Sequence, residues 1–405
     1  MRRFDVVIAG GGLVGTSLAL ALSRVRRGAL SVALIDRAGP VSDDRAFALS
    51  AGSRRFFEAL GIWDRIAVDA EPFREMVITD SRLEDPVRPI FLTFRGEAAP
   101  GEAFAYMVPE AAPLMALQSA LAASGVELIE GSVLDCRTDE AGATVTLSDE
   151  RSMRASLVIA CDGARSRLRE LAAIGWAHWS YKQAGIVATI GTERSLEGRA
   201  EEHFLPSGPF AILPLADNRF SMVWTEREER VPSLLAQDDA SLLEEIEKRA
   251  GLRFGRLSLL SRPRAYPLSF GLARKFGAAR LGLVGDAAHL IHPIAGQGLN
   301  LGLRDVAALV ELISDHCALG LDPGSVQLID AYDCARRADT VAMASVTDTL
   351  NRLFSNDAMP VRLVRDLGLG LVDRLPSLKK RLIHEASASN PNLPKLMRGE
   401  ALPGF

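Results

Sequence analysis

The chain has 405 residues, of which 48% are hydrophobic and 24% charged, so it can bury a large core and we expect two domains or one domain with an insertion. Its 47 basic and 51 acidic residues give a net charge of −4, which excludes recruitment of nucleic acid by a positive field. The four cysteines show no CxxC spacing, which excludes a secreted disulfide framework and indicates a reducing compartment.

The N-terminal segment predicts a βαβ unit, which implies a parallel sheet. Its parts are a β-rich run at 4–9, glycines at 10–12, apolar side chains at helical spacing over 13–24 and a second β-rich run at 31–35. The uncharged stretch 6–23 follows Arg2 and Arg3 and resembles an export signal. Its four glycines and the charges on both sides argue against one, so we expect this segment to fold with the protein.

The glycines of this unit fit a nucleotide-binding turn. Gly10, Gly12 and Gly15 match GxGxxG between a strand and a helix, where glycine permits a tight turn and lets the backbone approach a pyrophosphate. Asp36 ends the second strand, where a carboxylate accepts hydrogen bonds from a ribose. The pattern predicts a bound dinucleotide and leaves FAD and NAD open.

Later segments indicate that an antiparallel part interrupts the parallel sheet. Residues 157–160 and 281–284 are short apolar runs that end in Asp-containing turns, as buried parallel strands do. Between them, residues 210–213 and 220–224 flank a polar turn and predict a hairpin. From Asp305 onward the pattern is mostly helical.

Two segments resemble the flavin motifs of class A flavoprotein monooxygenases. Residues 161–169 (CDGARSRLR) are similar to the Asp-Gly motif of that class, and residues 285–305 are similar to its second flavin motif. The resemblance implies that the dinucleotide is FAD. It assigns contacts with the cofactor to Asp162, Gly163, Asp286, Gly296, Gln297, Gly298 and Asn300.

The resemblance also implies a role for the loop that opens the helix after Asp286. In the class, the loop backbone at Pro293 and Gly296 and the helix N-terminus stabilise negative charge on the reduced flavin. A helix dipole contributes roughly 0.3–1 kcal/mol to a nearby anion. We therefore expect the backbone at Pro293 and Gly296 to contribute to catalysis.

Within the class, four segments resemble the ubiquinone-biosynthesis branch, the 2-polyprenyl-6-methoxyphenol hydroxylase-like enzymes. They are 43–50 (DDRAFALS), 204–209 (FLPSGP), 292–295 (HPIA) and 351–355 (NRLFS). By this likeness Arg45 is expected at the flavin or its pyrophosphate, and the backbone of Val133 at the adenine. Two positions depart from the pattern: Asp36 stands where most members carry Glu, and residues 110–112 (EAA) stand where an Arg often contacts FAD.

The resemblance implies FAD-dependent hydroxylation of a polyprenylated phenol in ubiquinone biosynthesis, through a flavin hydroperoxide, with dioxygen and NAD(P)H or another electron donor as co-substrates. Two alternatives remain: a hydroxylase of a small soluble aromatic compound, and a flavin-binding assembly subunit without turnover. No metal site is expected, because His289 and His292 have no third ligand at a usual spacing.

The expected fold is α/β: a Rossmann-like FAD-binding domain with an inserted antiparallel β-sheet substrate domain and a helical C-terminal region. We predict residues 1–72, 104–175 and 272–330 for the FAD-binding domain, 73–103 and 176–271 for the substrate domain, and 331–405 for the C-terminal region. Residues 359–384 mix leucines and valines with basic residues. This indicates either a helix pair packed on the body or a basic surface for a membrane or a quinone-synthesis complex. We therefore expect a cytoplasmic protein, peripheral at the membrane under the second interpretation.

Overall fold

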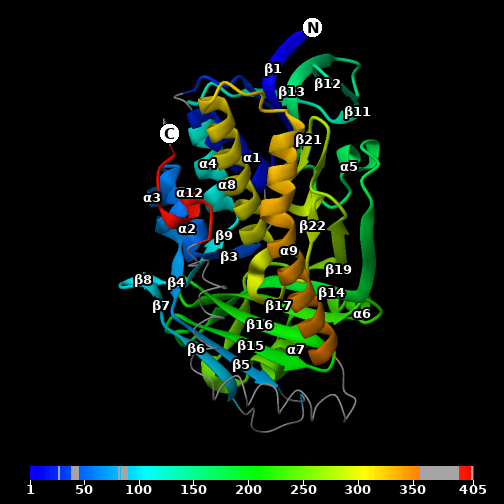
Figure 1. Ribbon diagram of the computed structural model, residues 1–405. Helices are drawn as coiled ribbons and strands as arrows, with labels where there is room; N and C mark the ends of the chain where they lie inside the picture. The colour runs from blue at the N-terminus through cyan, green and yellow to red at the C-terminus, as the bar shows by residue number, and fades with distance from the viewer. Residues whose placement is uncertain (26–27, 38–44, 81–82, 84–89, 356–391, 403–404) are drawn as a thin grey trace.

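Two large β-sheets organise the molecule, one in the upper half and one in the lower half of Figure 1. The computed structural model describes residues 1–25, 28–37, 45–80, 83, 90–355, 392–402 and 405. The segment 359–384, predicted to be a helix pair or a basic surface, lies outside the described residues. Among the described helices, none is long and apolar enough to cross a membrane.

The upper sheet has the strand order β10-β2-β1-β13-β12-β11, and β21 also pairs with β13. Its strands are β1 (Arg2–Ala9), β2 (Val32–Asp36), β10 (Glu127–Glu130), β11 (Val133–Asp139), β12 (Gly142–Leu147), β13 (Ser152–Ala160), β20 (Gly277–Ala278) and β21 (Leu281–Leu283). β1 runs parallel to β2 and β13, and β13 runs parallel to β21. Val6, Val7 and Ile8 are fully buried, as expected where helices cover both faces of a parallel sheet. The βαβ prediction is confirmed, with the helix α1 at Leu13–Arg24.

The lower sheet is mainly antiparallel, with the order β22-β19-β14-β17-β16-β15-β5-β6 and β18 beside β14. Its strands are β5 (Glu75–Asp80), β6 (Ile90–Arg95), β14 (Trp176–Thr192), β15 (Arg199–Leu205), β16 (Gly208–Leu215), β17 (Arg219–Arg227), β18 (Leu257–Leu259), β19 (Arg264–Ala273) and β22 (His289–Leu290). The predicted hairpin is confirmed as β16 and β17. Asp217 and Asn218 in its turn have φ of 59° and 53°, a left-handed conformation that Asp and Asn tolerate.

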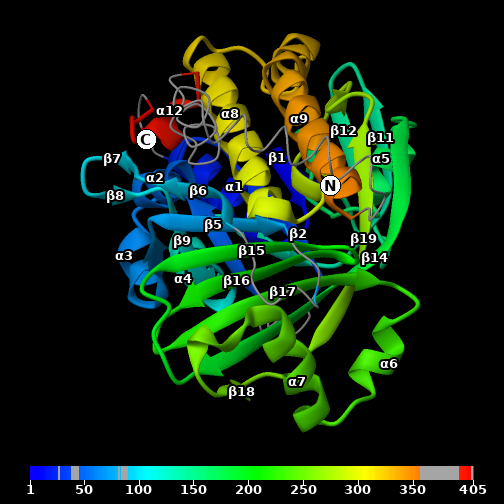
Figure 2. The same ribbon diagram turned by 90° about the horizontal axis from the view of Figure 1, so that it is seen from below.

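The two faces of the lower sheet have different partners because successive side chains of a strand point to opposite sides. Phe210, Phe220 and Trp224 pack on the outer face with α7 (Asp239–Ala250). Figure 2 shows α7 and α6 (Val231–Leu235) on the side of this sheet away from α1 and α8. The inner face is therefore turned toward the nucleotide-binding half.

Smaller elements join the two sheets. A three-stranded sheet consists of β3 (Ala46–Ser50), β9 (Ala105–Pro109) and β4 (Glu71–Phe73), and β7 (Glu97–Ala99) pairs with β8 (Glu102–Ala103). The remaining α-helices are α2 (Ala51–Ala59), α3 (Trp63–Ile66), α4 (Ala111–Leu121), α5 (Arg167–Leu171), α8 (Gln297–Ala318), α9 (Val326–Phe354) and α12 (Lys395–Arg398). Short 3-10 turns lie at Ala67–Asp69, Leu252–Phe254, Gly285–Ala287 and Ile294–Gly296.

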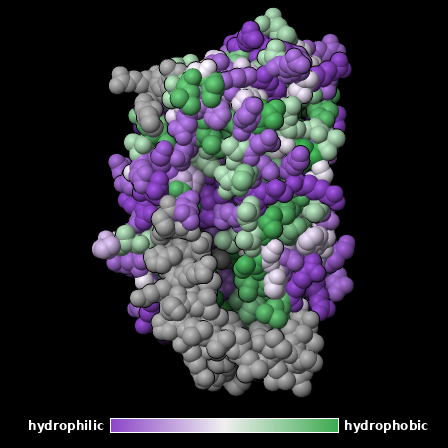
Figure 3. Space-filling model, in the orientation of Figure 1, coloured by the Kyte–Doolittle hydropathy of each residue, from purple (hydrophilic) through white to green (hydrophobic). Residues whose placement is uncertain are grey.

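Helix α9 runs from the upper half of the molecule down to the lower sheet (Figure 1). On the face seen in Figure 3, one apolar patch lies below the middle of the molecule, beside the grey atoms. Val341 and Val346 of α9 are exposed apolar side chains. The expected α/β fold with an antiparallel insertion and a helical C-terminal region is confirmed. The domain boundaries stay a prediction.

Candidate active site

The glycine turn after β1 is held by close contacts that leave no room for a side chain at two positions. A Cβ at Gly10, whose φ is +107°, would lie 2.2 Å from the carbonyl oxygen of Cys161, and a Cβ at Gly15 would lie 1.9 Å from the carbonyl oxygen of Gly10. A Cβ at Gly12 would meet no other described atom within 4 Å. Gly10 and Gly15 therefore serve the packing of strand, turn and helix, whereas Gly12 borders open space.

Asp36 lies where the sequence places it, at the end of β2 beside this turn. A Cβ on Gly11 would come within 2.5 Å of the Asp36 Oδ2, so the carboxylate rests against the turn. Such a position suits a ribose hydroxyl of a dinucleotide bound along the turn. Asp has a shorter side chain than Glu, and the carboxylate of Asp36 nevertheless reaches the turn because the end of β2 lies close to it.

The Asp-Gly segment follows β13 at the same edge of the sheet. Asp162 Oδ2 accepts a hydrogen bond from the Leu168 N–H at 3.3 Å, whereas its buried Oδ1 has no partner among the described residues. Arg169 donates to the carbonyl oxygens of Ala164 and Ala287 at 2.8 and 2.9 Å. The arginine thereby ties this segment to the second flavin motif, and the buried acceptor of Asp162 lies next to Gly163, which lines the cavity described below.

Asp286 follows β21, and its carboxylate is accessible from the cavity described below. The surrounding protein desolvates it and raises its pKa, while His289 and Arg45 act in the opposite direction. A carboxyl at this depth can accept a hydroxyl hydrogen bond from a ligand.

Helix α8 begins at the cavity with no side chain capping its N-terminus. Gly296 just before it has φ +61°, and a Cβ at Gly298 would meet no other described atom within 4 Å. The first backbone N–H groups of a helix lack intrahelical acceptors and carry partial positive charge. Together with Pro293 and Gln297, which also line the cavity, this end of α8 forms an anion-stabilising wall.

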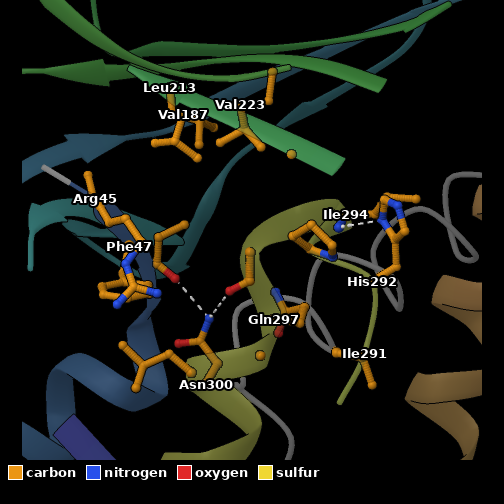
Figure 4. Close-up of a pocket in the computed structure, with 18 of the residues that line it drawn as sticks. Arg45, Phe47, Val187, Leu213, Val223, Ile291, His292, Ile294, Gln297 and Asn300 are labelled. Carbon is orange, nitrogen blue, oxygen red and sulfur yellow. Dashed lines mark hydrogen bonds between the residues drawn. The ribbon is translucent and has the colours of Figure 1, made fainter. Parts of the chain in front are cut away.

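The side chain of Asn300 has a structural task (Figure 4). Its Oδ1 accepts hydrogen bonds from the Ser50 N–H at 2.9 Å and the Ser53 Oγ at 2.7 Å. Its Nδ2 donates to the carbonyl oxygens of Ala48 and Gly296 at 2.8 and 3.1 Å, the two dashed lines at Asn300 in Figure 4. An amide side chain has two donor and two acceptor positions, and all four are engaged. Asn300 therefore fixes the flavin loop to β3, and any contact of Asn300 with the cofactor falls to its backbone.

Arg45 reaches the cavity and has a partner that the sequence did not reveal. Its guanidinium pairs with both carboxylate oxygens of Glu110, at 3.0 and 3.1 Å, and lies 5.6 and 5.4 Å from the ring centres of Phe47 and Tyr266. The glutamate that replaces an expected arginine thus balances the charge of Arg45. Val133 lies at the start of β11, outside the cavity lining, and its contact with adenine stays a prediction.

A buried ionic network supports the flavin loop from behind. Asp305 Oδ2 lies 2.6 Å from His289 Nε2 and accepts the Gly285 N–H at 3.1 Å, while Arg336 Nε donates to Oδ1 at 2.8 Å. Burial alone would raise the pKa of Asp305, but His289 and Arg336 outweigh this effect and lower it. The ionised carboxylate joins α8 and α9 to the backbone immediately before Asp286.

His292 enters the flavin loop as a neutral side chain. It is fully buried, its Nδ1 accepts the Ile294 N–H at 3.3 Å (Figure 4), and its ring lies 5.2 Å from that of Tyr181. Burial lowers the pKa of His292 to about 3, an effect that Asp348 opposes. His292 therefore orients the loop without adding charge near neutral pH.

These groups border one cavity of about 500 Å³ between the flavin loop and the inner face of the lower sheet. It brings together many of the predicted residues, namely Gly12, Gly15, Arg45, Gly163, Asp286, Pro293, Gly296, Gln297, Gly298 and Asn300. Gly10, Asp36 and Asp162 lie just outside the lining. Most of the remaining lining is apolar, and Figure 4 shows Val187, Leu213 and Val223 pointing from the sheet into this space.

Three of the segments that resemble the quinone branch meet at Ile294, which lines this cavity. Phe204 of β15 stacks on Phe354 of α9 with ring centres 3.9 Å apart, and both contact Ile294 of the flavin loop. Nearby, Asn351 donates to Gln183 at 3.0 Å, and Gln183 donates to the Ser207 carbonyl at 2.9 Å. In the sequence, these segments were identified only by their resemblance to the quinone branch. Their contact in the folded protein explains why they occur together in one chain.

Among the described residues, no group of three or more His, Cys, Asp or Glu side chains is arranged to hold a metal ion. Sequence reasoning missed Glu110, Arg336 and Glu202, because each acquires its role from a partner or wall formed by a distant segment. The spacing of His289 and Asp305 within one motif was the available signal for the buried network.

Comparisons with known proteins identify FAD as the cofactor of this chain. Residues 3–348 match the family model described as an FAD binding domain. The sequence is 41% identical over 98% of its length to the ubiquinone hydroxylase UbiL of Rhodospirillum rubrum, covering 93% of that protein. It is 33% identical over 94% of its length to the 3-demethoxyubiquinol 3-hydroxylase of Escherichia coli, covering 98% of that protein.

The fold resembles the crystal structure of p-nitrophenol 4-monooxygenase PnpA from Pseudomonas putida, with a TM-score of 0.76, 19% identity, and coverage of 96% of this chain and 99% of that one. That likeness concerns the fold. The family match and the full-length relatives show more: the chain belongs to the FAD-binding-domain family, as a flavin-dependent aromatic hydroxylase of the same group as the ubiquinone hydroxylases.

Proposed function

We propose that the chain hydroxylates a ring carbon of a polyprenylated phenol, a precursor of ubiquinone, with dioxygen and NAD(P)H or another electron donor as co-substrates. The names of the two full-length relatives support the pathway. The observation that carries most weight is the cavity, which places an apolar sheet face opposite the N-terminus of α8.

When bound, FAD supplies the oxygen-activating chemistry. The turn from Gly10 to Gly15 would receive its pyrophosphate, Asp36 a ribose, and Asp162 and Asp286 further hydroxyl groups. The α8 N-terminus would face the flavin ring and favour negative charge there. The unpaired Oδ1 of Asp162 and the open space at Gly12 are the features that fit this assignment.

The chain's own contribution to the reaction is positioning and exclusion of water. Val187, Leu213 and Val223 offer an apolar surface to the aromatic ring and the first prenyl units, which gain roughly 25 cal/mol per Å² of buried apolar area. The stacked pair Phe204 and Phe354 packs with Ile294, which lines the cavity. A dry site strengthens electrostatic interactions at the flavin loop.

The test uses the purified flavoprotein with an electron donor and a short-chain prenylphenol, and mass spectrometry of the product. Gain of one oxygen atom on the ring supports the proposal, and the wild-type protein stripped of FAD serves as the control that lacks cofactor. In parallel, mass spectrometry of a deletion strain identifies the precursor that accumulates and thereby the ring position. An unaltered quinone pool, with turnover of small unprenylated phenols, would instead establish the soluble-aromatic alternative.

A further inference from the structure

Glu202 is the acidic residue that the lower sheet contributes to the described cavity lining. It lies in the middle of β15, between Ala200 and Phe204 on the same strand face. Phe204 contacts Ile294 of the flavin loop, so Glu202 lies two residues along the strand from a side chain in contact with that loop. Only 4% of Glu202 is exposed.

The strand register places Glu202 at one end of an apolar row across the sheet. Glu202 is opposite Ala211 on β16, Ala211 is opposite Val223 on β17, and Val223 is opposite Val187 on β14. All four residues line the cavity. Figure 4 shows Val187 and Val223 of this row directed toward the flavin loop. The small side chain of Ala211 leaves room beside the carboxyl group, so a ring lying along this row meets Glu202 at its edge.

The carboxyl group of Glu202 makes no hydrogen bond or ion pair with any described residue, unlike its sequence neighbour. Glu201 points to the opposite face and pairs with Arg199 at 3.1 Å and with His203 at 3.2 Å. A buried carboxyl without a partner is costly unless a ligand satisfies it. Burial raises the pKa of Glu202 to about 7, so it can exchange a proton near neutral pH.

Resting on the function proposed above, we propose that Glu202 is a catalytic residue that accepts the proton of the substrate's phenolic hydroxyl. The phenolic O–H bond breaks, the proton moves to a carboxylate oxygen of Glu202, and the electron pair stays on the phenolic oxygen. The resulting phenolate donates electron density to its ortho and para ring carbons, where an electrophilic oxygen would add. No further oxidant or reductant takes part in this proton transfer.

Few charged groups share the surroundings of Glu202. On its own strand face Ala200 and Phe204 do not titrate, and neither do Ile78 and Ala211, which lie opposite it on β5 and β16. The titratable groups that face the same space from neighbouring elements are Asp80 on β5, Tyr266 on β19, His292 in the flavin loop, and Arg45, Glu110, Cys161 and Asp286 on the wall across the cavity.

The test compares two probes that differ in one proton: 2-allylphenol and its methyl ether. Their dissociation constants are measured by calorimetry on the FAD-loaded protein from pH 5.5 to 8.5. In the wild type, we expect the preference for the phenol to grow about tenfold as Glu202 ionises, because a hydrogen bond to a charged acceptor is stronger than one to a neutral acceptor. In Glu202→Gln the preference should be independent of pH, and Glu202→Asp should restore part of the dependence.

Turnover of 2-allylphenol provides the second readout. Glu202→Gln should lower kcat by about 10²–10⁴-fold with little change in KM and should remove the rise of kcat with pH. Glu229→Gln, which changes an exposed carboxylate, is the matched control and should behave as the wild type. Equal flavin content and melting temperature establish that the variants are folded.

The outcomes separate the two proposals. If both probes bind and Glu202→Gln keeps the wild-type pH dependence and kcat, the role of Glu202 is refuted while the proposed function stands. If neither probe binds the wild type and no product forms, the phenolic substrate class fails, and the role of Glu202 fails with it.

Discussion

Replacement of Glu202 by Gln should stabilise the protein, and by more at high pH than at low pH. Burial raises the pKa of this carboxyl on folding, from 4.5 to about 7. Between these two pKa values the folded state holds a proton that the unfolded chain has already lost. Ionisation of Glu202 therefore does not lower the free energy of unfolding below about pH 4, and it lowers it progressively as the pH rises toward 7. From these two pKa values, the cost is about 1 kcal/mol at pH 5 and about 3 kcal/mol at pH 8.

The assay is the melting temperature of Glu202→Gln relative to the wild type, both loaded with FAD, at the two pH values. For a chain of 405 residues, about 1 kcal/mol corresponds to roughly 1 °C, so the variant should melt about 1 °C higher at pH 5 and about 3 °C higher at pH 8. Subtraction of the wild type removes groups that titrate in both proteins, and Glu229→Gln reports the effect of losing an exposed carboxylate. An equal difference at the two pH values, or a less stable variant at pH 8, would refute the reasoning.

Four further substitutions test the nucleotide turn, the buried network and the flavin loop. Gly12→Ala should keep the fold but weaken FAD binding at least tenfold, about 1.4 kcal/mol, because its methyl group enters the open space at the turn that the pyrophosphate would occupy. Gly15→Ala should instead lose soluble protein, because its Cβ would overlap the Gly10 carbonyl oxygen. A wild-type flavin content in Gly12→Ala, or a wild-type yield of soluble Gly15→Ala, would contradict this. Asp305→Asn should lower the stability by about 3–5 kcal/mol, because it removes the buried carboxylate that pairs with both His289 and Arg336, so that Arg336 keeps only Asp339. A melting temperature within 1 °C of the wild type would count against an ionised Asp305. Asn300→Ala should speed the release of flavin, measured by the rise of free-flavin fluorescence, and an unchanged rate would show that the loop does not need this clamp.

Local sequence was sufficient for the parts of the fold that depend on backbone conformation and periodicity. The strand, turn and helix around Gly10 to Gly15 occur where predicted, because glycine is needed where φ is positive or where two backbones touch. The hairpin of β16 and β17 was equally clear from its alternation and polar turn. The flavin motifs identified the cofactor because their residues are contiguous along the chain.

The tertiary structure alone decided which distant side chains meet. Glu110 pairs with Arg45 across 65 positions, Arg336 reaches Asp305 from another helix, and Glu202 joins the apolar row through the registers of four strands. A strand pattern tells which residues share a face, but it does not tell which neighbour lies opposite, because one residue of register shift changes every partner. The sequence by itself thus determined that FAD binds and where its turn lies, whereas strand pairing and helix packing set the charges and the walls of the cavity in which the substrate would react.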